Sequence, residues 1–457
     1  MVFEFLLYWF PGGSMKVCGI IAEYNPFHSG HAYQIAKARE QSNCDYVIAV
    51  MSGDFVQRGA PALTDKYSRT REALHEGVDL VLMLPVYGST ASAEGFARTG
   101  VAALLSTGVV DAISFGCEDT SVCSEPYLRL AQALAQEGAD FRTALADRLA
   151  AGVPYARARV EAVRSCFGKD YDLSLLDSPN NLLAFEYVRA LAYFGTNMQL
   201  FPIRRLGSYH DTDGLISDVE LSAEDLVPAS VASDSNAPSP AGVMFASASA
   251  CRRALLSDSA SELQALEHAR QIPAEVCRLL VDYMNNYDFL QEDDFSLSLH
   301  YALLAQRDSG YETFWDCGSD LSARIIKQLD SFESFSQFCD LLKNKSVTRA
   351  RVARVLTHIL LQLPAQMPAP LTSAEGTLPY LRVLGFRQTA APLLHELKQR
   401  TRVPLITRVP EAERMLSSEA MLYFKQDLFA AELYRSVLLQ KCGRCYPDDY
   451  RRKIEIV

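Results

Sequence analysis

The sequence lacks any apolar run long enough to cross a lipid bilayer, and its cysteines form no disulfide framework. Residues 1–14 hold a short apolar run that is interrupted by Glu4 and has no basic segment before it, so they do not make a signal peptide. The eleven cysteines are scattered, and several lie in apolar stretches where a buried thiol packs well. These absences exclude a membrane-spanning chain and a disulfide scaffold, and they predict a cytoplasmic protein.

A metal-binding motif is also missing. Cys442 and Cys445 form a CxxC pair, but no second pair and no nearby His completes a set of four zinc ligands. We therefore predict that the side chains of this chain hold no metal.

The chain is long enough for about two domains, its composition is ordinary, and its charge is unevenly distributed along the sequence. Its 457 residues are 49% hydrophobic and 22% charged, which suits a folded protein of about two domains. The net charge of -11 does not suit a nucleic-acid-binding protein as a whole. Residues 340–457, however, hold 19 Lys and Arg against 11 Asp and Glu, a net charge of +8. Either this basic region binds a polyanion, or its charges form the solvated surface of a helical domain.

Five apolar runs alternate with segments of helical periodicity. The runs cover Val17–Ala22, Asp45–Met51, Val78–Pro85, Val110–Gly116 and Met198–Ile203. They are apolar nearly throughout, as expected for parallel strands that helices cover on both faces. The pattern predicts βαβ units in an α/β fold with a Rossmann-like, doubly wound parallel sheet.

We divide the chain into an extension and two domains. Met15 directly precedes the first strand, so residues 1–14 are interpreted as an N-terminal extension. Residues 15–255 contain the sheet, a helical insertion over about 126–170 and a Ser- and Pro-rich loop over 223–241. Residues 256–457 are predicted to form a mainly α-helical, partly basic C-terminal domain, with helices over 349–363 and 418–439.

The residues after the first strand carry the clearest chemical signal, because ligands of open α/β sheets bind at the carboxyl ends of the strands. His28 and His31 flank Gly30 at the turn from this strand into a helix. Two His residues at this spacing are often only packed or exposed, but the free N–H groups of a helix start attract phosphate. Imidazoles placed there can donate to phosphate oxygens, and Gly30 would let a nucleotide approach the backbone.

In this context FHSGH resembles the HxGH motif of the nucleotidylyltransferase superfamily, which implies that the sheet is of the nucleotidylyltransferase type. The resemblance also implies a second motif, an ISSTxIR-like segment that opens a late helix and holds the triphosphate. ASASACR, over Ala246–Arg252, is the matching segment, with Ser249 in place of the usual Thr and Cys251 at an apolar position. Alone this segment would be an ordinary Ser-rich helix cap, but its pairing with HxGH indicates a functional role.

Further segments make the resemblance more specific. They are GIIAEYNPFHSGH, MSGDFVQRGAP, DKYSRTREAL, SFGCE, SPNNLLAFEY and PIRRLGSYHD. From Met15 to about Arg253 the chain thus resembles the bacterial tRNA(Met) cytidine acetate ligases, and after that only loosely. The resemblance implies an enzyme that activates acetate with ATP as acetyl-AMP and then acetylates N4 of the wobble cytidine of elongator tRNA(Met).

The same resemblance implies two sets of site residues. Those that would stabilise charge on the transferring and leaving phosphates are His28, His31, Ser247, Ser249 and Arg252. Those that would bind ATP are Ile21, Ala22, Glu23, Tyr24, Asn25, Pro26, Phe27, His28, Ser29, Gly30, His31, Ala32, Tyr33, Gln34, Gly116, Asn180, Asn181, Arg204 and Arg205. Taken alone, Arg204 and Arg205 could equally be the solvated end of a strand.

Mg²⁺ is expected to accompany ATP, held by phosphates and water. The basic C-terminal region is the expected platform for the tRNA, with Lys343, Lys345 and residues 451–453 as candidate contacts. Two alternatives stay open at this point. One is an adenylyltransferase that acts on a small phosphorylated cofactor precursor, and the other is a nucleotide- or RNA-binding protein that has lost catalysis.

Overall fold

The computed structural model describes residues 15–135, 138–151, 153, 155–168, 173–206, 245–257, 259–365 and 376–457. The expected extension, residues 1–14, and the expected loop, residues 223–241, lie outside the described residues. No helix within the described ranges is long and apolar enough to cross a membrane.

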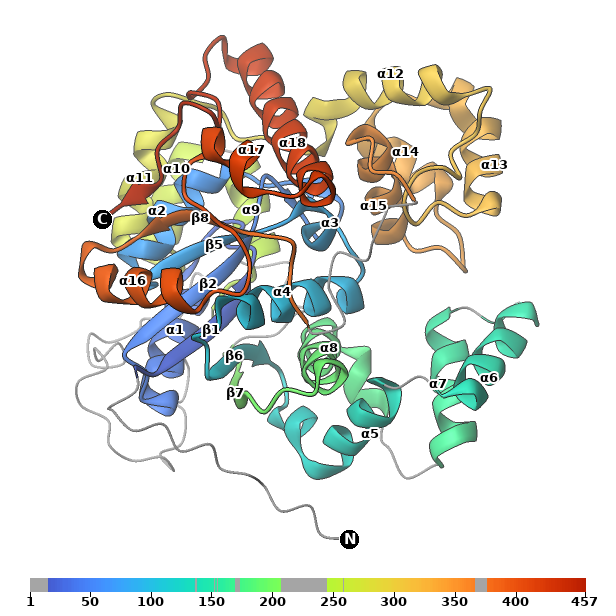
Figure 1. Ribbon diagram of the computed structural model, residues 1–457. Helices are drawn as coiled ribbons and strands as arrows, with labels where there is room; N and C mark the ends of the chain where they lie inside the picture. The colour runs from blue at the N-terminus through green and yellow to red at the C-terminus, as the bar shows by residue number, and fades with distance from the viewer. Residues whose placement is uncertain are drawn as a thin grey trace, which may run out of the picture.

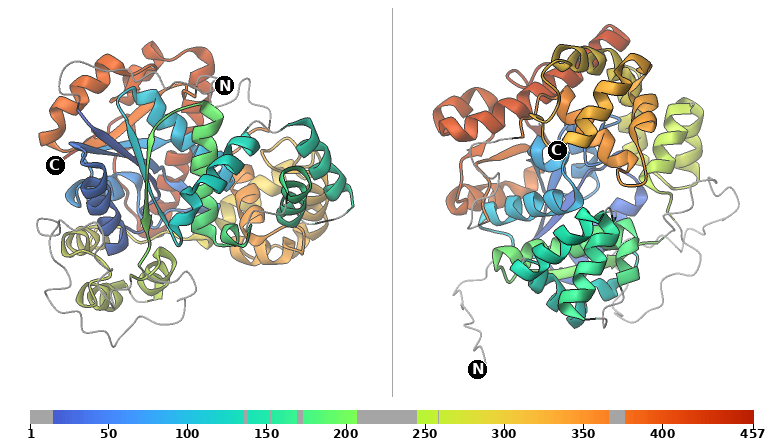
Figure 2. Two further views of the ribbon diagram at one scale, coloured as in Figure 1. Left: turned by 90° about the horizontal axis from the view of Figure 1, so that it is seen from below. Right: turned by 90° about the vertical axis from the view of Figure 1, so that its right-hand side faces the viewer.

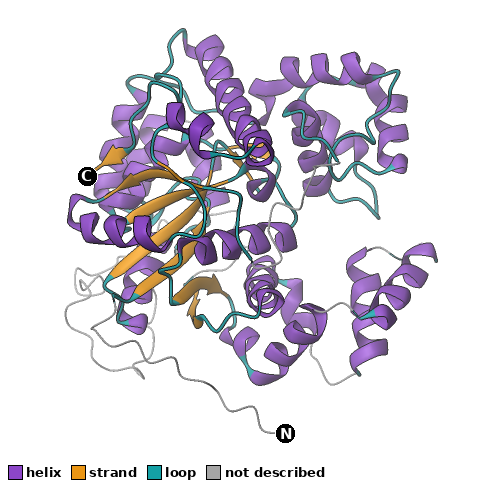
Figure 3. Cartoon of the chain, in the orientation of Figure 1, coloured by secondary structure: helices purple, strands orange, loops and turns teal. Residues whose placement is uncertain are grey.

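A single twisted sheet forms the centre of the molecule (Figure 3) and has the strand order β10-β8-β5-β2-β1-β6-β7, with β9 added beside β8. The strands are β1 (Val17–Ala22), β2 (Tyr46–Ser52), β5 (Leu80–Leu84), β6 (Ala112–Cys117), β7 (Gln199–Arg204), β8 (Leu381–Phe386), β9 (Leu405–Ile406) and β10 (Glu455–Ile456). A separate antiparallel hairpin joins β3 (Phe55–Val56) and β4 (Ala60–Pro61). Strands β5, β2, β1, β6 and β7 pair in parallel, which confirms the doubly wound parallel sheet.

The apolar strands are buried on both faces because successive side chains point to opposite sides of a sheet. In β1, Val17 and Ile21 belong to one hydrophobic core, while Cys18 and Ile20 belong to another. The first core is covered by α4 (Ala93–Thr107), α8 (Pro179–Phe194) and α16 (Ala391–Arg400). The second is covered by α1 (Ser29–Ser42), α2 (Lys66–His75), α9 (Ala248–Ser257), α10 (Ser259–His268) and α11 (Ala274–Met284).

Two groups of helices project from the same side of the sheet (Figures 1 and 2). One is the expected helical insertion, made of α5 (Glu125–Ala135), α6 (Ala139–Ala150) and α7 (Tyr155–Phe167). The other contains α12 (Ser296–Gln306), α13 (Ser319–Gln328), α14 (Phe335–Leu342) and α15 (Arg349–Leu360). A third hydrophobic core joins this second group to α3 (Val86–Ser89) and α18 (Ser418–Cys442), while the short α17 (Ala412–Met415) lies before α18.

The C-terminal region is mainly helical, but it also supplies three strands to the central sheet that the sequence analysis did not predict. β8 pairs antiparallel with β5, and β10 pairs parallel with β8. The β8 segment, LRVLGF, is a short apolar run, and periodicity alone cannot distinguish such a run from part of a buried helix. The sheet therefore continues past residue 255, where we had placed the domain boundary.

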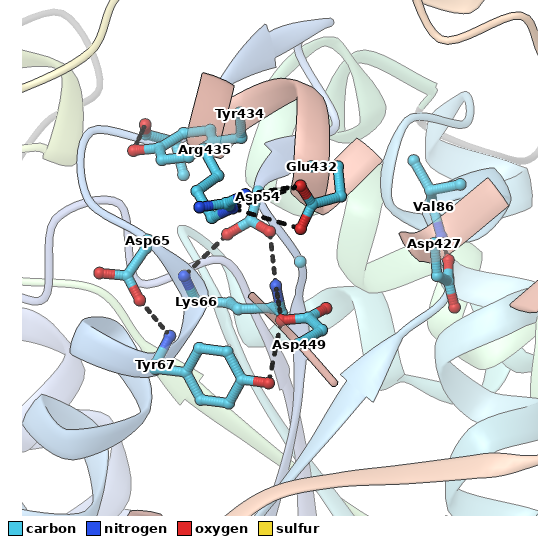
Figure 4. Close-up of polar contacts among 12 residues, drawn as sticks. Asp54, Asp65, Lys66, Tyr67, Val86, Asp427, Glu432, Tyr434, Arg435 and Asp449 are labelled. Atoms are coloured by element: carbon cyan, nitrogen blue, oxygen red, sulfur yellow. Dashed lines mark hydrogen bonds and ion pairs between the residues drawn. The ribbon is translucent and has the colours of Figure 1, made fainter. Parts of the chain in front are cut away.

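A buried network of charges ties the end of the chain to the loops after β2 (Figure 4). Lys66 Nζ lies 2.8 Å from a carboxylate oxygen of Asp54 and 3.1 Å from one of Asp449. Asp449 also lies 2.8 Å from Arg382 Nη2 and accepts a hydrogen bond of 3.1 Å from the Tyr67 hydroxyl. All five side chains are buried. Two cations and two carboxylates thus compensate one another between α2, β8 and the C-terminal segment.

Candidate active site at the carboxyl ends of β1 and β6

The site lies where the strand order reverses. Strand β1 is flanked by β2 on one side and by β6 on the other, so the connections leave β1 in opposite directions. Doubly wound sheets bind ligands at the carboxyl ends of strands beside such a switch point. A small pocket opens there, lined by His28, Gly30, His31, Tyr33, Gln34, Gly116, Ile203, Arg204, Arg205, Leu206 and Phe245. A larger cavity lies at the amino ends of β1, β6 and β7 and contains no residue of either nucleotide motif.

The two imidazoles of the HxGH motif cap helix α1. His28 is the N-cap residue, and its Nδ1 accepts a hydrogen bond of 3.1 Å from the Gly30 N–H. His31 reaches back, and its Nδ1 accepts from the His28 N–H at 3.2 Å. The two rings stack with their centroids 3.8 Å apart. This reciprocal arrangement is a capping box built from imidazoles, and it fixes both rings at the end of β1.

The capping box changes our view of how phosphate is held. The sequence predicts free N–H groups at the start of α1, but the structure pairs them: Ser29 N donates to Gln271 O at 2.9 Å, and His31 N donates to His28 O at 2.8 Å. Gly30 makes room for the His28 ring, since a Cβ there would lie 2.8 Å from His28 Cε1. The imidazoles and nearby guanidinium groups, rather than free amides, are therefore the groups available to phosphate.

Both imidazoles are electrically neutral. Burial, reinforced by Arg205 and Arg252, lowers the pKa of His28 to about 3. Burial, with help from His28 and Arg205, also lowers the pKa of His31 well below its usual value. Because Nδ1 of each ring accepts a hydrogen bond, the proton of each neutral ring resides on Nε2. Each ring thus has an Nε2–H donor for an anionic ligand, and a bound phosphate would itself favour protonation.

The low pKa of the His residues predicts acid sensitivity. His358, buried between the carbonyls of Trp315 and Thr90, has a pKa lowered to about 4, mainly by burial. The unfolded chain takes up protons at these His residues below about pH 6.5, whereas the folded chain does so only near the lowered pKa. The free energy of unfolding should therefore fall by about 1.4 kcal/mol per pH unit for each such ring as the pH drops from 6.5 to 4. Urea unfolding at pH 7 and pH 5 measures this slope, and His358→Gln should reduce it.

Two arginines flank the His pair. Arg205 follows β7, is half-buried, and packs beside Gly116, where a Cβ would lie 3.5 Å from Arg205 Cγ. Arg252 comes from α9, and its guanidinium donates to the Asn25 carbonyl and, at 3.1 Å, to the Ser249 hydroxyl. Both side chains depress the pKa of His28 and thus lie within its electrostatic reach. Arg204 also lines the pocket, but its side chain is exposed.

The second motif opens α9 as expected. The Ser247 hydroxyl accepts from the Ala250 N–H at 3.2 Å, and the Ser247 carbonyl accepts from Cys251 N at 3.0 Å. Gln271, which the sequence analysis missed, joins the two motifs: its side chain accepts from Ala246 N at 2.6 Å and its carbonyl from Ser29 N. Because Gln271 belongs to no recognisable motif, only the folded structure reveals this link.

Arg69 is a second positioning residue that the sequence analysis did not single out, although it lies in DKYSRTREAL. Its guanidinium is fully buried and donates to the carbonyl of Glu23 at 2.7 Å, to that of Ser52 at 3.1 Å and to that of Gly53. One side chain therefore holds the ends of β1 and β2 together. Glu72 on the same helix is also buried, and burial raises its pKa to about 8.

Asn180 and Asn181 open α8 beside the end of β6. The Asn180 amide and the Ser178 hydroxyl both donate to the Glu118 carboxylate. Asn181 is buried, its Oδ1 accepts from Glu118 N at 2.9 Å, and its Nδ2 donates to Leu175 O at 3.1 Å. Asn181 thus orients the loop after β6, while Asn180 is half-buried and nearer the surface.

Most other residues expected to bind ATP shape the loop after β1. Tyr24 and Phe27 are buried, and their rings lie 5.0 Å and 5.4 Å from that of His31. Asn25 Oδ1 accepts from Leu63 N at 2.8 Å, and Glu23 accepts from Gln57 N at 2.8 Å. These side chains are therefore used in holding the loop. Their contribution to ATP binding, with that of Ile21, Ala22, Pro26 and Ala32, would come from the backbone or from packing.

The two neighbouring arginines of α9 provide a test of the motif register. Arg252 is held beside the His pair, whereas Arg253 is exposed. Arg252→Ala should reduce ATP turnover by about 10²-fold or more, because it removes a preorganised charge. Arg253→Ala should change it little. Initial rates of pyrophosphate release with acetate measure both, and equal losses would show that the motif is misplaced.

Gly116 offers a second test. A Cβ at this position would make only an ordinary contact with Arg205, at 3.5 Å, so the fold should accept Gly116→Ala. If the nucleotide lies against this residue, the variant should raise the KM for ATP about tenfold, equivalent to about 1.4 kcal/mol, at an unchanged melting temperature. An unchanged KM would remove Gly116 from the site.

The sheet, the switch-point pocket and the imidazole pair with flanking arginines define a nucleotidyltransferase. In agreement, a family model described as HIGH Nucleotidyl Transferase matches residues 15–226 and 230–447.

Comparison with individual proteins is more specific. The chain is 34% identical to a tRNA(Met) cytidine acetate ligase of Thermoanaerobacter sp. (strain X514), over 92% of this chain and 95% of that protein. It is 33% identical to one of Clostridium kluyveri, over 89% and 93% of the two chains. The crystal structure of Thermotoga maritima TmcAL with alpha-thio ATP is 26% identical and matches with a TM-score of 0.80, covering 97% of this chain and 99% of that one. The chain therefore belongs to the tRNA(Met) cytidine acetate ligase family of HIGH nucleotidyl transferases.

Proposed function

We propose that the chain is an ATP-dependent ligase that converts acetate to acetyl-AMP and acetylates N4 of the wobble cytidine of elongator tRNA(Met). The observation that carries the proposal is the pair of neutral imidazoles at the switch point, whose Nδ1 atoms accept the capping hydrogen bonds and leave the proton on Nε2, within electrostatic reach of Arg205 and Arg252. The names of the relatives support the choice of acetate and tRNA(Met) as substrates. The Thermotoga protein, solved with alpha-thio ATP, supports ATP as the nucleotide.

The chemistry needs positioning and charge stabilisation, and no covalent intermediate on the enzyme. An acetate oxygen attacks the α-phosphorus of ATP in line, the bond to the β-phosphate oxygen breaks, and pyrophosphate leaves. His28 and His31 donate from Nε2 to the phosphate oxygens, while Arg205 and Arg252 neutralise their charge. The N4 amine of cytidine then attacks the acetyl carbonyl, loses a proton, and AMP leaves.

Mg²⁺ would accompany the ATP. The described residues contain no group of three or more His, Cys, Asp or Glu side chains that could hold a metal ion. Near the pocket, Glu118 is occupied by Ser178 and Asn180, and Glu23 by Gln57. The ion would therefore be held mainly by phosphate oxygens and water, and it would offset phosphate charge.

The tRNA must present its wobble base out of the helical stack to reach such a pocket. One residue of the expected basic platform is unsuited to this role, because Arg452 packs over the Tyr67 ring at 4.9 Å and pairs with Glu455. Lys343, Lys345, Arg451 and Lys453 are exposed and stay candidate RNA contacts. The surface ion pairs of Lys343 with Asp340 and of Arg451 with Asp448 are weak.

Incubation with labelled acetate and ATP, with and without total tRNA, tests the proposal. We expect acetyl-AMP in both reactions and acetylated cytidine only with tRNA. An adenylyltransferase for a small phosphorylated cofactor precursor would release pyrophosphate with that precursor and without acetate. Binding of ATP and tRNA with no product of either kind would indicate a binding protein that has lost catalysis.

A further inference from the structure

A small hairpin connects the nucleotide site to the second helical group. The turn between β3 and β4 contains Gly59, which has a φ of +71° and lies directly on helix α15. A Cβ on Gly59 would lie 2.3 Å from the backbone nitrogen of Arg354. The Gly59 carbonyl also accepts a hydrogen bond of 2.9 Å from the Thr357 hydroxyl. The tip of the hairpin is thus fixed against α15, and Arg58 is the residue directly before Gly59 at this contact.

The half-buried guanidinium of Arg354 is only partly satisfied by the described residues. Its Nε is buried and has no hydrogen-bond partner among the described residues. The neighbouring carboxylate, Asp316, is already paired with Arg351 Nη2 at 3.0 Å. Removing a guanidinium from water without a partner is unfavourable, so such a group is normally kept where an anion joins it.

The other carboxylates of this region are occupied as well. Glu292 pairs with Arg349 at 2.8 Å, and Glu23 accepts from the backbone of Gln57. On the side of the nucleotide site, Arg58 is close enough to Arg252 to lower the pKa of its guanidinium, although burial is the larger cause. Glu23 and Glu292 act on Arg252 as well and offset part of this positive charge. Arg58 thus lies in the hairpin between Gln57, which contacts Glu23, and Gly59, which contacts the backbone of Arg354.

We propose that Arg354 and Arg58 bind a backbone phosphate of the tRNA, next to the nucleotide that enters the active site. The inference rests on the proposed function, because it names where the RNA substrate of that site is held. The pocket beside the His pair is lined by residues between His28 and Phe245 and by none from α15, so Arg354 lies outside that lining. A wobble base that reaches the acetyl-adenylate must carry its flanking phosphates to this edge of the pocket.

The test compares Arg354→Gln and Arg58→Gln with the wild type, using the full chain and an unmodified elongator tRNA(Met) transcript. Each variant should weaken tRNA binding roughly tenfold or more at low salt, because a hydrogen bond to a charged group is lost. Each should reduce the slope of log Kd against log salt by about 0.7–0.9, the value for one phosphate contact. Acetyl-AMP formation without tRNA should stay unchanged. Arg278→Gln, at an exposed Arg of α11 paired with Glu275, is the matched control.

Thermal stability separates a binding role from a structural one. Arg354→Gln removes a desolvated charge, so its melting temperature should equal or exceed that of the wild type. If Arg354→Gln melts earlier, Arg58→Gln, at an exposed position, decides the question. Unchanged tRNA affinity and salt slope in Arg58→Gln and in a stable Arg354→Gln would overturn the inference, as would a loss of acetyl-AMP formation without tRNA. Failure of the wild type to acetylate tRNA would instead contradict the proposed function.

Discussion

Replacing Gly30 by Ala should lower acetyl-AMP formation by about 10²–10³-fold, as much as His28→Ala or His31→Ala. A Cβ at residue 30 would lie 2.8 Å from Cε1 and 2.9 Å from Nδ1 of His28, so the ring must leave its place. The capping bond from Gly30 N to His28 Nδ1 would then be lost, together with the orientation of the Nε2–H donor. The variant thus tests the geometry of the imidazole pair without removing either imidazole.

The stability of the same variant distinguishes this effect from damage to the fold. Residue 30 lies in the first turn of α1, where Ala is a better helix former than Gly by about 1 kcal/mol, which offsets part of the lost cap. We expect a melting temperature close to that of the wild type and a rate close to that of His28→Ala. Gly138→Ala, where a Cβ meets nothing within 4 Å, is the control and should leave both unchanged. Normal acetyl-AMP formation by Gly30→Ala would show that the ring position is unimportant.

The sequence was sufficient for the features that local patterns encode. Strand β1 covers Val17–Ala22 as predicted, because its residues are apolar at every position and a polar turn follows them. The HxGH motif and ASASACR were found by their resemblance to known motifs, and the structure brings Arg252 beside His28, although more than 200 residues separate them.

Features that depend on distant contacts could not be predicted. The imidazole capping box requires the actual ring positions, and the usual reading of a helix start as free amides was wrong here. In the sequence, Arg69 cannot be distinguished from any other charged residue of an amphipathic helix. Its role depends on contacts with the carbonyls of Glu23 and Ser52, at the ends of β1 and β2. Arg452, counted with the basic surface, is half-buried against Tyr67 because β10 returns to the sheet.

Because the C-terminal region supplies strands to the central sheet, we expect a chain truncated before these strands to be unstable. A chain that ends near Leu255 loses β8, which pairs with β5, and also Asp449, one of the two carboxylates that pair with Lys66, so it should not fold. The division drawn from the sequence, with a boundary at residue 255, treats the C-terminal region as a separate helical domain. A soluble, folded fragment with a cooperative unfolding transition would show that the shared sheet is dispensable.

Asp449→Ala tests the importance of the C-terminal segment for stability with one substitution, and it should destabilise the full chain by about 3–5 kcal/mol. The substitution removes the carboxylate that pairs with both Lys66 and Arg382, and both cations stay buried. Lys66 keeps Asp54, at 2.8 Å, as its ion-pair partner. Tyr67→Phe removes the hydroxyl that donates to Asp449 and accepts from Arg382 at 3.0 Å, and it should cost about 2 kcal/mol. Denaturant unfolding at pH 7 measures both, and Asp448→Asn, at the neighbouring half-buried position, is the control.

The pH dependence of these variants adds an independent check on the network. The cations Arg382 and Lys66 hold the pKa of Asp449 below its usual range, against the opposing effect of burial. A carboxyl whose pKa is lowered by folding contributes stability above its unfolded pKa of about 3.9 and loses it as the pH falls toward the folded value. The difference in unfolding free energy between wild type and Asp449→Ala should therefore be constant from pH 5 to pH 8 and shrink below about pH 4. A small difference in unfolding free energy at pH 7 would mean that water reaches Lys66 and Arg382. The C-terminal segment would then contribute little to the stability of the sheet.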